Sequence, residues 1–351
     1  MRLGTFVQIS DLHFGLVDPA SFDARTEVWR RLPWLDGMLG HSYRSLERLV
    51  KFFDQIREDE PGCQLIVTGD LTTVGHPDEF DTAGEYLADQ LRPPKGRYLG
   101  LEVANWRDWA IPGNHDHWPG SPRILGTTTS AFVQYFPNLP QADPCIPLST
   151  GHEVRFLRID TDANVGKLSQ ERILARGSFC GELDKLSENL RSKGLETPGV
   201  KEIRVLCLHH SRSYRGFFLR IDEPSRRRLD RFIQEHGVSI LLCGHIHEPP
   251  TAKPLQAESP KGLSLNVLEG RSGTTSQLDK SFRRCLSLGW LGRKWQNSLL
   301  LHRLMKVGDE IHWQTEVYLE SRKTFERADA LRSDVQAVTT ILAWPTPGKS
   351  P

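Results

Sequence analysis

Three features that define large classes of proteins are missing from this sequence of 351 residues. No apolar run approaches the roughly 20 residues that a helix needs to cross a bilayer, which argues against a helical membrane protein. The six cysteines include no Cys-x-x-Cys pair, so neither a zinc finger nor the disulfide framework of a secreted protein is indicated. The first expected strand begins at Phe6 and leaves no separate segment for a secretory signal peptide. We therefore expect a cytoplasmic protein with no membrane partner.

An excess of charge of either sign is also missing. The chain has 45 lysines and arginines against 44 aspartates and glutamates, for a formal net charge of +1. Such a molecule has little long-range field to draw it onto nucleic acid or an anionic membrane. Nucleic acid is therefore a disfavoured partner, and any attraction for an anionic ligand must be local.

Strand-like apolar runs alternate with helical periods along the first 250 residues. Leu46, Leu49 and Phe53 recur at helical spacing, for example, whereas residues 64–68 form a short apolar run. Strand, turn and helix in succession argue for an α/β fold with a mostly parallel sheet covered on both faces. We expect strands at 6–10, 64–68, 109–111, 153–160, 203–208 and 238–243, and helices at 45–57, 77–91, 181–191 and 224–236.

Beyond Pro249-Pro250 the pattern changes to strands without intervening helices, at 263–268, 297–307 and 311–319. We expect these strands to be antiparallel additions that form a second sheet against the first. Residues 1–320 would then form one domain, with a metal-binding core at 6–270 and C-terminal antiparallel strands at 263–320. A charged, proline-containing tail would follow at 321–351.

Polar residues follow five of the expected strands, at the point where each strand ends. Residues two apart in an extended segment point to the same side, so Asp11 and His13 can converge on one ion. His245 and His247 repeat this geometry. In order, these strand ends supply Asp11, His13, Asp70, Asn114, His115, His209, His245 and His247.

The mixture of carboxylate, imidazole and amide groups indicates the kind of ion. It suits borderline divalent metals such as Mn, Fe, Zn, Co or Ni, and it is too rich in nitrogen for a calcium or a pure magnesium site. The ligands are numerous enough for two ions, and a carboxylate such as Asp70 can bridge the pair.

These motifs resemble the signature of the calcineurin-like metallophosphoesterases: Asp-x-His, Gly-Asp, Gly-Asn-His-Asp, a later histidine and Gly-His-x-His, complete and in order. The resemblance covers residues 6 to about 270. It implies a four-layer α/β/β/α sandwich of two mixed sheets flanked by helices, with the metals at the rim of the sheets.

The resemblance also implies a role for each residue of the motifs. Two cations lower the pKa of a shared water, and the resulting bridging hydroxide attacks phosphorus in line. His115 would assist the leaving oxygen, and Asp116 would orient the His115 imidazole. Asp70 would bridge the two ions, one held by Asp11, His13 and His247 and the other by Asn114, His209 and His245.

Substrate contacts are expected beside the motif residues. His117 and His210 are adjacent to predicted site residues, and Arg212 could grip a phosphate. The segments 14–44, 117–150 and 271–296 are expected to be loops that determine specificity. Structural or surface positions are expected for the remaining histidines, His41, His76, His152, His236, His302 and His312, and packing positions for Trp29, Trp34, Trp118 and Tyr135.

Three functions compete at this point. The leading hypothesis is a phosphoesterase that hydrolyses a phosphodiester or phosphomonoester of a small molecule, with nucleotides among the candidates. The second is a metal-dependent nuclease for DNA or RNA, motivated by arginines at 212–228 and 283–294. The third is a non-catalytic metal-binding scaffold. The substrate, the metals and the oligomeric state stay open.

Overall fold

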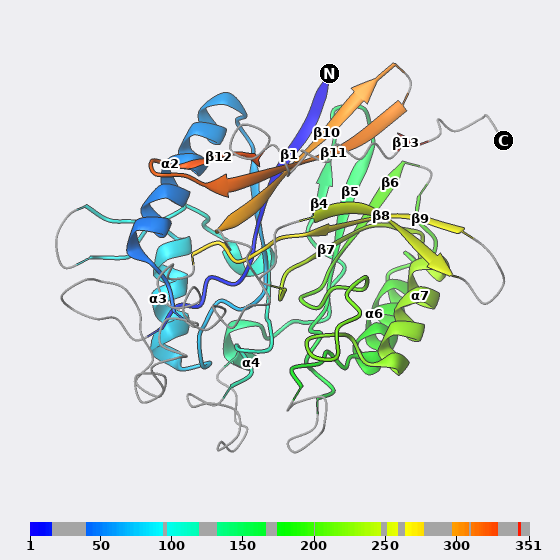
Figure 1. Ribbon diagram of the computed structural model, residues 1–351. Coiled ribbons are helices and arrows are strands. Elements are labelled where there is room, and N and C mark those ends of the chain that lie inside the picture. Colours follow the sequence, from blue (N-terminus) through cyan, green and yellow to red (C-terminus); the bar gives the residue numbers. More distant parts are fainter. Residues whose placement is uncertain are drawn as a thin grey trace.

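Two β-sheets face each other, and helices cover the outer face of each, so that four layers are stacked as α/β/β/α (Figure 1). This computed structural model describes residues 1–15, 40–93, 97–118, 132–165, 174–199, 201–246, 251–258, 264–276, 297–308, 310–328 and 343–344. The layers confirm the expected sandwich of two mixed sheets. None of the helices in these residues is both long and apolar enough to span a membrane.

The first sheet joins the beginning of the chain to its last strands. It contains β1 (Arg2–Ile9), β2 (Gln64–Thr68), β3 (Ala110–Ile111), β10 (Ser298–Val307), β11 (Glu310–Glu320), β12 (Phe325–Arg327) and β13 (Ala343–Trp344). The order is β12-β11-β10-β1-β2-β3, with β13 paired to β11. Strands β1, β2 and β3 are parallel, whereas β10 is antiparallel to β1. Helices α2 (Tyr43–Asp59) and α3 (Pro77–Leu87) cover the outer face.

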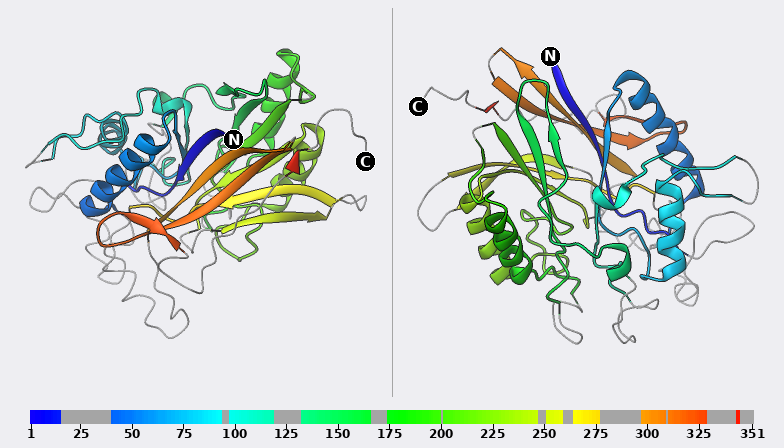
Figure 2. Two further views of the ribbon diagram at one scale, coloured as in Figure 1. Left: turned by 90° about the horizontal axis from the view of Figure 1, so that it is seen from above. Right: turned by 180° about the vertical axis from the view of Figure 1, so that it is seen from behind.

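The second sheet is built from the middle of the chain. It contains β4 (Cys145–Pro147), β5 (Glu153–Arg158), β6 (Glu202–Cys207), β7 (Val238–Cys243), β8 (Thr251–Glu258) and β9 (Ser264–Arg271). The order is β4-β5-β6-β7-β9-β8, and β5, β6, β7 and β9 are parallel. Helices α6 (Cys180–Ser192) and α7 (Glu223–Glu235) cover its outer face, opposite α2 and α3 (Figure 2). The short helices η1 (Trp106–Asp108) and α4 (Phe132–Tyr135) complete the described elements.

The strand assignment needs two corrections. The last strands do not form a sheet of their own: β10 and β11 extend the first sheet beside β1, and β9 joins the second sheet parallel to β7. The six earlier strands do not form one sheet either, because they divide into β1 to β3 and β5 to β7. Each sheet is therefore covered by helices on one face and by the other sheet on the opposite face. Strand β8, which contains Pro254 and was not expected, lies at a sheet edge, where a missing N–H is tolerated.

Helix α3 shows how local sequence sets the ends of an element. Pro77 occupies its first turn, and His76 Nδ1 accepts a hydrogen bond from the backbone N–H of Asp78 at 3.2 Å. The helix ends at Leu87, four residues before the expected end. The carbonyls of Tyr86 and Leu87 accept instead from the returning residues 101 and 103, at 2.9 and 2.7 Å, which stops the helical ladder.

The space between the sheets is filled mainly by apolar side chains, with a few buried polar contacts among them. Phe6 of β1 stacks on Trp313 of β11, with ring centroids 5.5 Å apart, and meets Phe156 of the second sheet at 5.3 Å. Gln8 of β1 crosses the gap, because its Nε2 donates to the Cys243 carbonyl of β7 at 2.9 Å. This contact helps to fix the two sheets relative to each other next to the ends of β1 and β7.

Candidate metal centre

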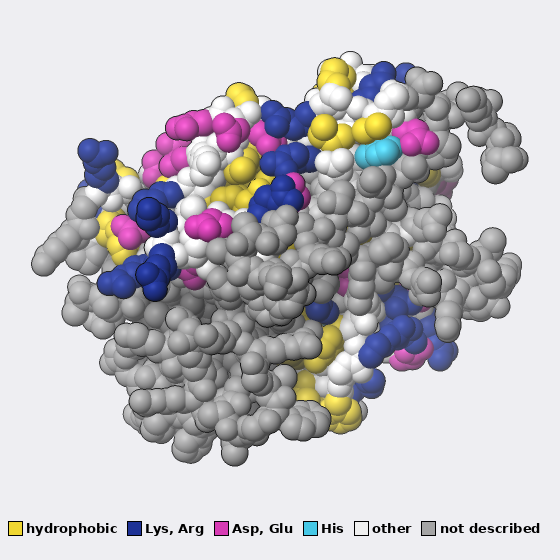
Figure 3. All heavy atoms as spheres, turned by 45° about the horizontal axis from the view of Figure 1, so that its top comes forward, with side chains coloured by type: hydrophobic (Ala, Val, Ile, Leu, Met, Phe, Trp, Pro, Cys, Tyr) yellow, Lys and Arg dark blue, Asp and Glu magenta, His cyan; other side chains and the backbone are white. Residues whose placement is uncertain are grey.

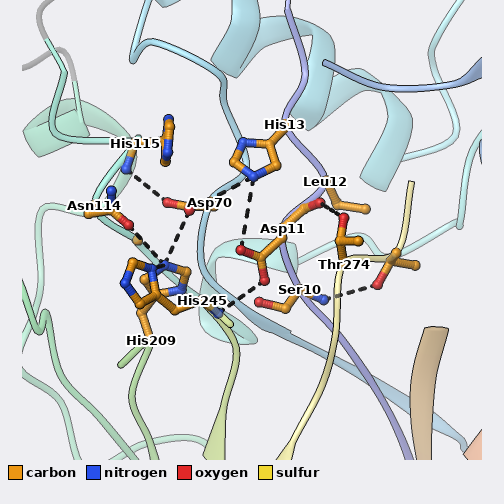
Figure 4. A network of polar contacts seen from close by, with 12 residues as sticks. Ser10, Asp11, Leu12, His13, Asp70, Asn114, His115, His209, His245 and Thr274 are labelled. Carbon is orange, nitrogen blue, oxygen red and sulfur yellow. Dashed lines mark hydrogen bonds and ion pairs between the residues drawn. The ribbon is translucent and has the colours of Figure 1, made fainter. Parts of the chain in front are cut away.

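Six buried polar residues meet where strands of both sheets end (Figure 4). Strands β1, β2 and β3 carry four of them at their carboxyl ends, and β6 and β7 carry the other two. Ligands of open α/β sheets are commonly bound at such strand ends. The six are Asp11, His13, Asp70, Asn114, His209 and His245, and His115 lies beside them, partly exposed.

Asp70 lies at the centre of the cluster. Its Oδ2 is 3.2 Å from Nε2 of His209 and 4.0 Å from Nε2 of His13, and its Oδ1 accepts the backbone N–H of His115 at 2.8 Å. Two groups of three donors, each with all ligand atoms within 4.8 Å of one another, share this carboxylate. One group is His13, Asp70 and His115, and the other is Asp70, His209 and His245.

Asp11 and Asn114 extend the two groups. Asp11 Oδ1 is 3.9 Å from Nε2 of His13, and its Oδ2 accepts the backbone N–H of His245 at 3.1 Å. Asn114 Oδ1 lies 3.3 Å from Nε2 of His209. Each donor group therefore has a further oxygen beside it.

Backbone carbonyls orient two of the imidazoles. Nδ1 of His209 donates to the Thr68 carbonyl at 2.7 Å, and Nε2 of His245 donates to the Ala175 carbonyl at 3.2 Å. The other ring nitrogens, His209 Nε2 and His245 Nδ1, are 3.1 Å apart. An N–H held on a carbonyl fixes the tautomer and directs the remaining nitrogen to a metal, so both rings are arranged as ligands.

The charges within the cluster are strongly coupled. Burial alone would raise the pKa of Asp70, but the imidazoles of His209, His115 and His13 outweigh it and hold the pKa well below its usual range. Burial opposes the charged form of His209, yet the Asp70 carboxylate outweighs burial and raises the pKa of His209 to about 10. The negative charge of the Asp70 carboxylate, which favours the protonated form of His209, would also attract a metal cation.

The backbone around the cluster is strained and tightly packed. Four non-glycine residues have left-handed φ angles: Asp11 (55°), His13 (49°), Asp70 (54°) and His245 (68°). Each such residue costs about 1–3 kcal/mol unless its surroundings impose it. The glycines of the motifs allow the close approach, because a Cβ on Gly113 would lie 2.2 Å from Asp70 Oδ1.

Asp116 has a different role from the one expected. Its carboxylate accepts four hydrogen bonds, from the backbone N–H groups of Leu71, Thr72 and Gly113 and from the Thr72 hydroxyl, at 2.8 to 3.1 Å. It therefore joins the turn after β3 to the turn after β2. Nδ1 of His115 donates instead to the Thr73 carbonyl at 2.8 Å, so this carbonyl orients the imidazole.

Histidine 209, and not His210, is the member of the pair that reaches Asp70. Nε2 of His210 donates to the Ala175 carbonyl at 3.3 Å, and its Nδ1 accepts from the Thr161 hydroxyl at 2.8 Å. Because His210 is buried between these groups, it supports the carbonyl that orients His245 rather than facing a substrate.

The other two expected substrate contacts are paired within the protein. Arg212 is buried and makes a two-point ion pair with Asp230 of α7, at 2.6 and 2.8 Å, so it does not act as a phosphate grip. His117 Nε2 lies 2.9 Å from Asp160 Oδ1, which ties the turn after β3 to the end of β5.

Parts of the expected site lie outside the described residues, namely His247, the arginines of 283–294, Trp29, Trp34 and most of the segments 14–44 and 271–296. The beginning of the last segment is described, and it does not form a substrate loop. Residues 272–276 are buried beneath the end of β1, where Thr274 Oγ1 donates to the Asp11 carbonyl at 3.1 Å and Ser276 Oγ donates to the Leu12 carbonyl at 2.7 Å.

Sequence reasoning missed most of these supporting groups. The carbonyls of Thr68, Thr73 and Ala175 are backbone atoms, for which the sequence carries no signal. The polar run Ser272-Gly273-Thr274-Thr275-Ser276 directly after a strand was the available signal for the support of β1. The remaining histidines have structural or surface positions, as expected. His302 is buried and hydrogen-bonded, and His41 packs on Phe14. Polar contacts within the protein are made by His76, His152, His236 and His312.

Comparisons with known proteins agree with this site. The sequence model of the calcineurin-like phosphoesterases matches residues 4–249. No curated protein matches the sequence at a significant level. Among solved structures, the chain is similar to PhoD, with 11% identity, coverage of 93% of this chain and 72% of that one, and a TM-score of 0.43. It is also similar to Vps29 of Chaetomium thermophilum, with 12% identity, 98% and 100% coverage and a TM-score of 0.34.

The match from residue 4 to residue 249 spans most of the chain, including β1 to β7 and every motif of the cluster. This chain therefore belongs to the calcineurin-like phosphoesterase family, and this membership supports a hydrolase that acts on phosphoester bonds.

Proposed function

We propose that the protein is a binuclear metal-dependent phosphoesterase that hydrolyses a phosphodiester or phosphomonoester of a small molecule. One observation carries the proposal: Asp70 Oδ2 lies between Nε2 of His13, at 4.0 Å, and Nε2 of His209, at 3.2 Å, two nitrogens that we assign to different ions. A carboxylate in that position is suited to bridge two cations.

The proposed ligands are divided between the two ions. One ion, of Mn, Fe, Zn, Co or Ni, would be held by Asp11, His13 and His247, and the second by Asn114, His209 and His245. The donor set supports this, because the described residues among these are buried and their nitrogen and oxygen atoms suit borderline metals. When bound, the two cations would lower the pKa of a water and neutralise charge on the phosphate oxygens.

His115 is the proposed proton donor to the leaving oxygen. Its Nδ1 hydrogen is committed to the Thr73 carbonyl, so the transferable proton must be carried by Nε2. In the reaction, the oxygen of a water replaces the ester oxygen on phosphorus. The leaving oxygen takes the proton from Nε2 and departs as an alcohol, and Nε2 is protonated again from solvent.

Four of the six arginines of 212–228 form ion pairs within the protein, which gives the nuclease alternative little support. Arg212 pairs with Asp230, Arg226 and Arg227 pair with Glu223, and Arg228 pairs with Asp184 and Glu235. On the part of the surface that Figure 3 draws in colour, basic and acidic side chains are interspersed. A small-molecule ester is therefore the preferred substrate class, with nucleotides among the candidates.

The test uses Asp70→Asn with Asp59→Asn as its control, because Asp59 is an exposed residue of α2. Wild-type protein loaded with Mn, Fe, Zn, Co or Ni is assayed on chromogenic phosphodiesters and phosphomonoesters, and on single- and double-stranded DNA and RNA. We expect ester hydrolysis by the wild type and by Asp59→Asn, and its loss in Asp70→Asn. Cleavage of nucleic acid alone would favour the nuclease. Less than one ion per chain by elemental analysis, together with no turnover, would favour the scaffold.

We also propose that residues 1–320 act as one domain and that residues 321–351 are an appendage to it. The pairing of β12 and β13 with β11 attaches two short stretches of this appendage to the first sheet.

A further inference from the structure

The indole of Trp118 stacks on the imidazole of His115. The ring centroids are 4.3 Å apart and the ring planes are 30° apart. A second ring, His13, meets the same imidazole edge-on at 4.8 Å and 87°. His115 is therefore confined by two aromatic rings as well as by its hydrogen bond to the Thr73 carbonyl.

The position of Trp118 is fixed by the turn that carries it. Its backbone N–H donates to the His115 carbonyl at 3.0 Å. Its own carbonyl passes so close to Gly75 that a Cβ there would lie 2.0 Å away, and Gly75 has a φ of +71°. Asp116 and His117, the residues between the two rings, are held by the four hydrogen bonds and the Asp160 pair described above. The stack is thus part of an anchored turn.

A hydrogen bond at Nδ1 does not by itself determine where Nε2 lies. The second side-chain torsion of histidine is soft, and small combined changes of the two side-chain torsions can keep the hydrogen bond at Nδ1 while the ring pivots. That pivot moves Nε2, the nitrogen that would meet the leaving oxygen. A ring stacked on the face of the imidazole blocks the pivot.

We propose that Trp118 is a positioning residue that holds the His115 imidazole so that Nε2 faces the leaving oxygen. This inference rests on the proposed function of His115, because Trp118 acts through that ring and makes no bond to the substrate. A misplacement of about 1 Å at a reacting group can cost on the order of 10²-fold in rate. The effect should fall on substrates whose leaving oxygen needs a proton.

The kinetic test compares Trp118→Leu, which removes the flat ring, with Trp118→Phe, which keeps one. Each variant is assayed on esters with a poor leaving group, such as an alkyl alcohol or unsubstituted phenol, and on 4-nitrophenyl esters, whose leaving group departs without a proton. We expect Trp118→Leu to lower kcat for the poor leaving group by about 10- to 10²-fold with little change in KM. Its kcat for the nitrophenyl ester should change much less, and Trp118→Phe should stay close to the wild type.

Two controls separate positioning from a general loss of structure. Tyr98→Leu removes an exposed aromatic ring elsewhere and should leave both activities unchanged. In a His115→Ala background, Trp118→Leu should have no further effect, because the ring that it positions is gone. Equal losses on both leaving groups, no loss on either, or a full additional loss in the His115→Ala background would overturn the inference.

A second measurement requires neither metal nor substrate. In the NMR spectrum of the free protein, the ring current of the indole should move the imidazole protons of His115 upfield, and Trp118→Leu should abolish that shift. Identical His115 resonances in both proteins would show that the rings are not stacked and would also overturn the inference. If wild-type protein loaded with metals hydrolyses no ester, the proposed function is wrong, and the role of Trp118 that rests on it is wrong too. Hydrolysis by the wild type combined with any contrary result above overturns only the role of Trp118.

Discussion

A Cβ atom on Gly69 would lie 2.3 Å from Nδ1 of His209. That nitrogen donates to the Thr68 carbonyl, so an added methyl group must displace the ring or break the bond that orients it. Gly69 also has a φ of +100°, which disfavours any other residue. We expect Gly69→Ala to destabilise the protein by about 1–3 kcal/mol and to lower its metal content below that of the wild type. Chemical denaturation and elemental analysis measure the two effects.

The control for this variant is Gly62→Ala. Gly62 has a similar φ of +90° but no atom within 4 Å of its Cβ position, so it reproduces the backbone strain without the contact. Metal content should be normal in Gly62→Ala. If both variants bind metal equally well, the close approach of Gly69 to His209 does not matter for the site.

Asp116→Ala should be among the most damaging substitutions that leave the proposed ligands intact. It deprives three backbone N–H groups and a hydroxyl of their acceptor, and each buried group left without one costs about 1–3 kcal/mol. We expect a loss of about 4 kcal/mol or more in the free energy of unfolding, with Asp59→Ala at an exposed position of α2 as the control. Equal urea midpoints for the two variants would contradict this role of Asp116.

Arg212→Ala should reduce stability but leave substrate affinity unchanged. Arg212 and Asp230 form a largely buried pair with side chains 5% and 14% exposed, and removing one partner leaves the other charge uncompensated. We expect each single substitution to cost about 3 kcal/mol, and the double variant to cost little more than either. The measurements are unfolding curves and KM for the ester that the wild type hydrolyses. A raised KM for Arg212→Ala but not for Asp230→Ala would restore the phosphate-binding role.

The stability of the core should depend on pH through His302. Burial lowers the pKa of this imidazole to about 3. The environment agrees, because Nδ1 accepts the indole N–H of Trp313 at 3.2 Å and Nε2 donates to Gln8 Oε1 at 3.0 Å, which defines a neutral ring. Below about pH 6.5 the unfolded chain binds a proton at this histidine and the native state does not. Stability is therefore fully present above pH 6.5 and falls as the pH decreases toward 3.

His302→Gln removes this titration. The difference in unfolding free energy between the wild type and the variant should shrink by about 2 kcal/mol between pH 7 and pH 5, because 1.5 pH units lie below the unfolded pKa. Denaturation curves at several pH values measure it. A difference that does not change with pH would mean that His302 can be protonated inside the core.

The sequence was sufficient for most of the longer helices and strands and for the meeting of the described motif residues. Strand β2 was identified by the short apolar run at residues 64–68. Helix α2 was identified by the helical spacing of Leu46, Leu49 and Phe53, because apolar residues at this spacing lie on one buried face. The proximity of four site residues could also be predicted, because each follows a strand and the strand ends of open sheets share an edge. These residues are Asp11, Asp70, Asn114 and His209.

The division of strands between two sheets could not be read in the same way. Strands β1 and β6 have similar apolar patterns, and partner choice depends on contacts between segments hundreds of residues apart, as in the pairing of Phe6 with His302. The same limit applies to Arg212 and Asp116. The sequence shows their charges but not their partners. Arg212 pairs with Asp230, and Asp116 accepts hydrogen bonds from backbone N–H groups that include one of a turn 45 residues away.

The left-handed backbone at Asp11, His13, Asp70 and His245 has a consequence for the protein in a living cell. Conformational strain of about 1–3 kcal/mol at each of these residues lowers the folding stability of the metal-free protein. Cations that bind only the folded state would raise this stability in proportion to the logarithm of their concentration. If the site holds the proposed metals, starvation for them should therefore shorten the half-life of this chain by exposing it to proteolysis. Its abundance would then follow nutrient metal supply even if its synthesis stayed constant.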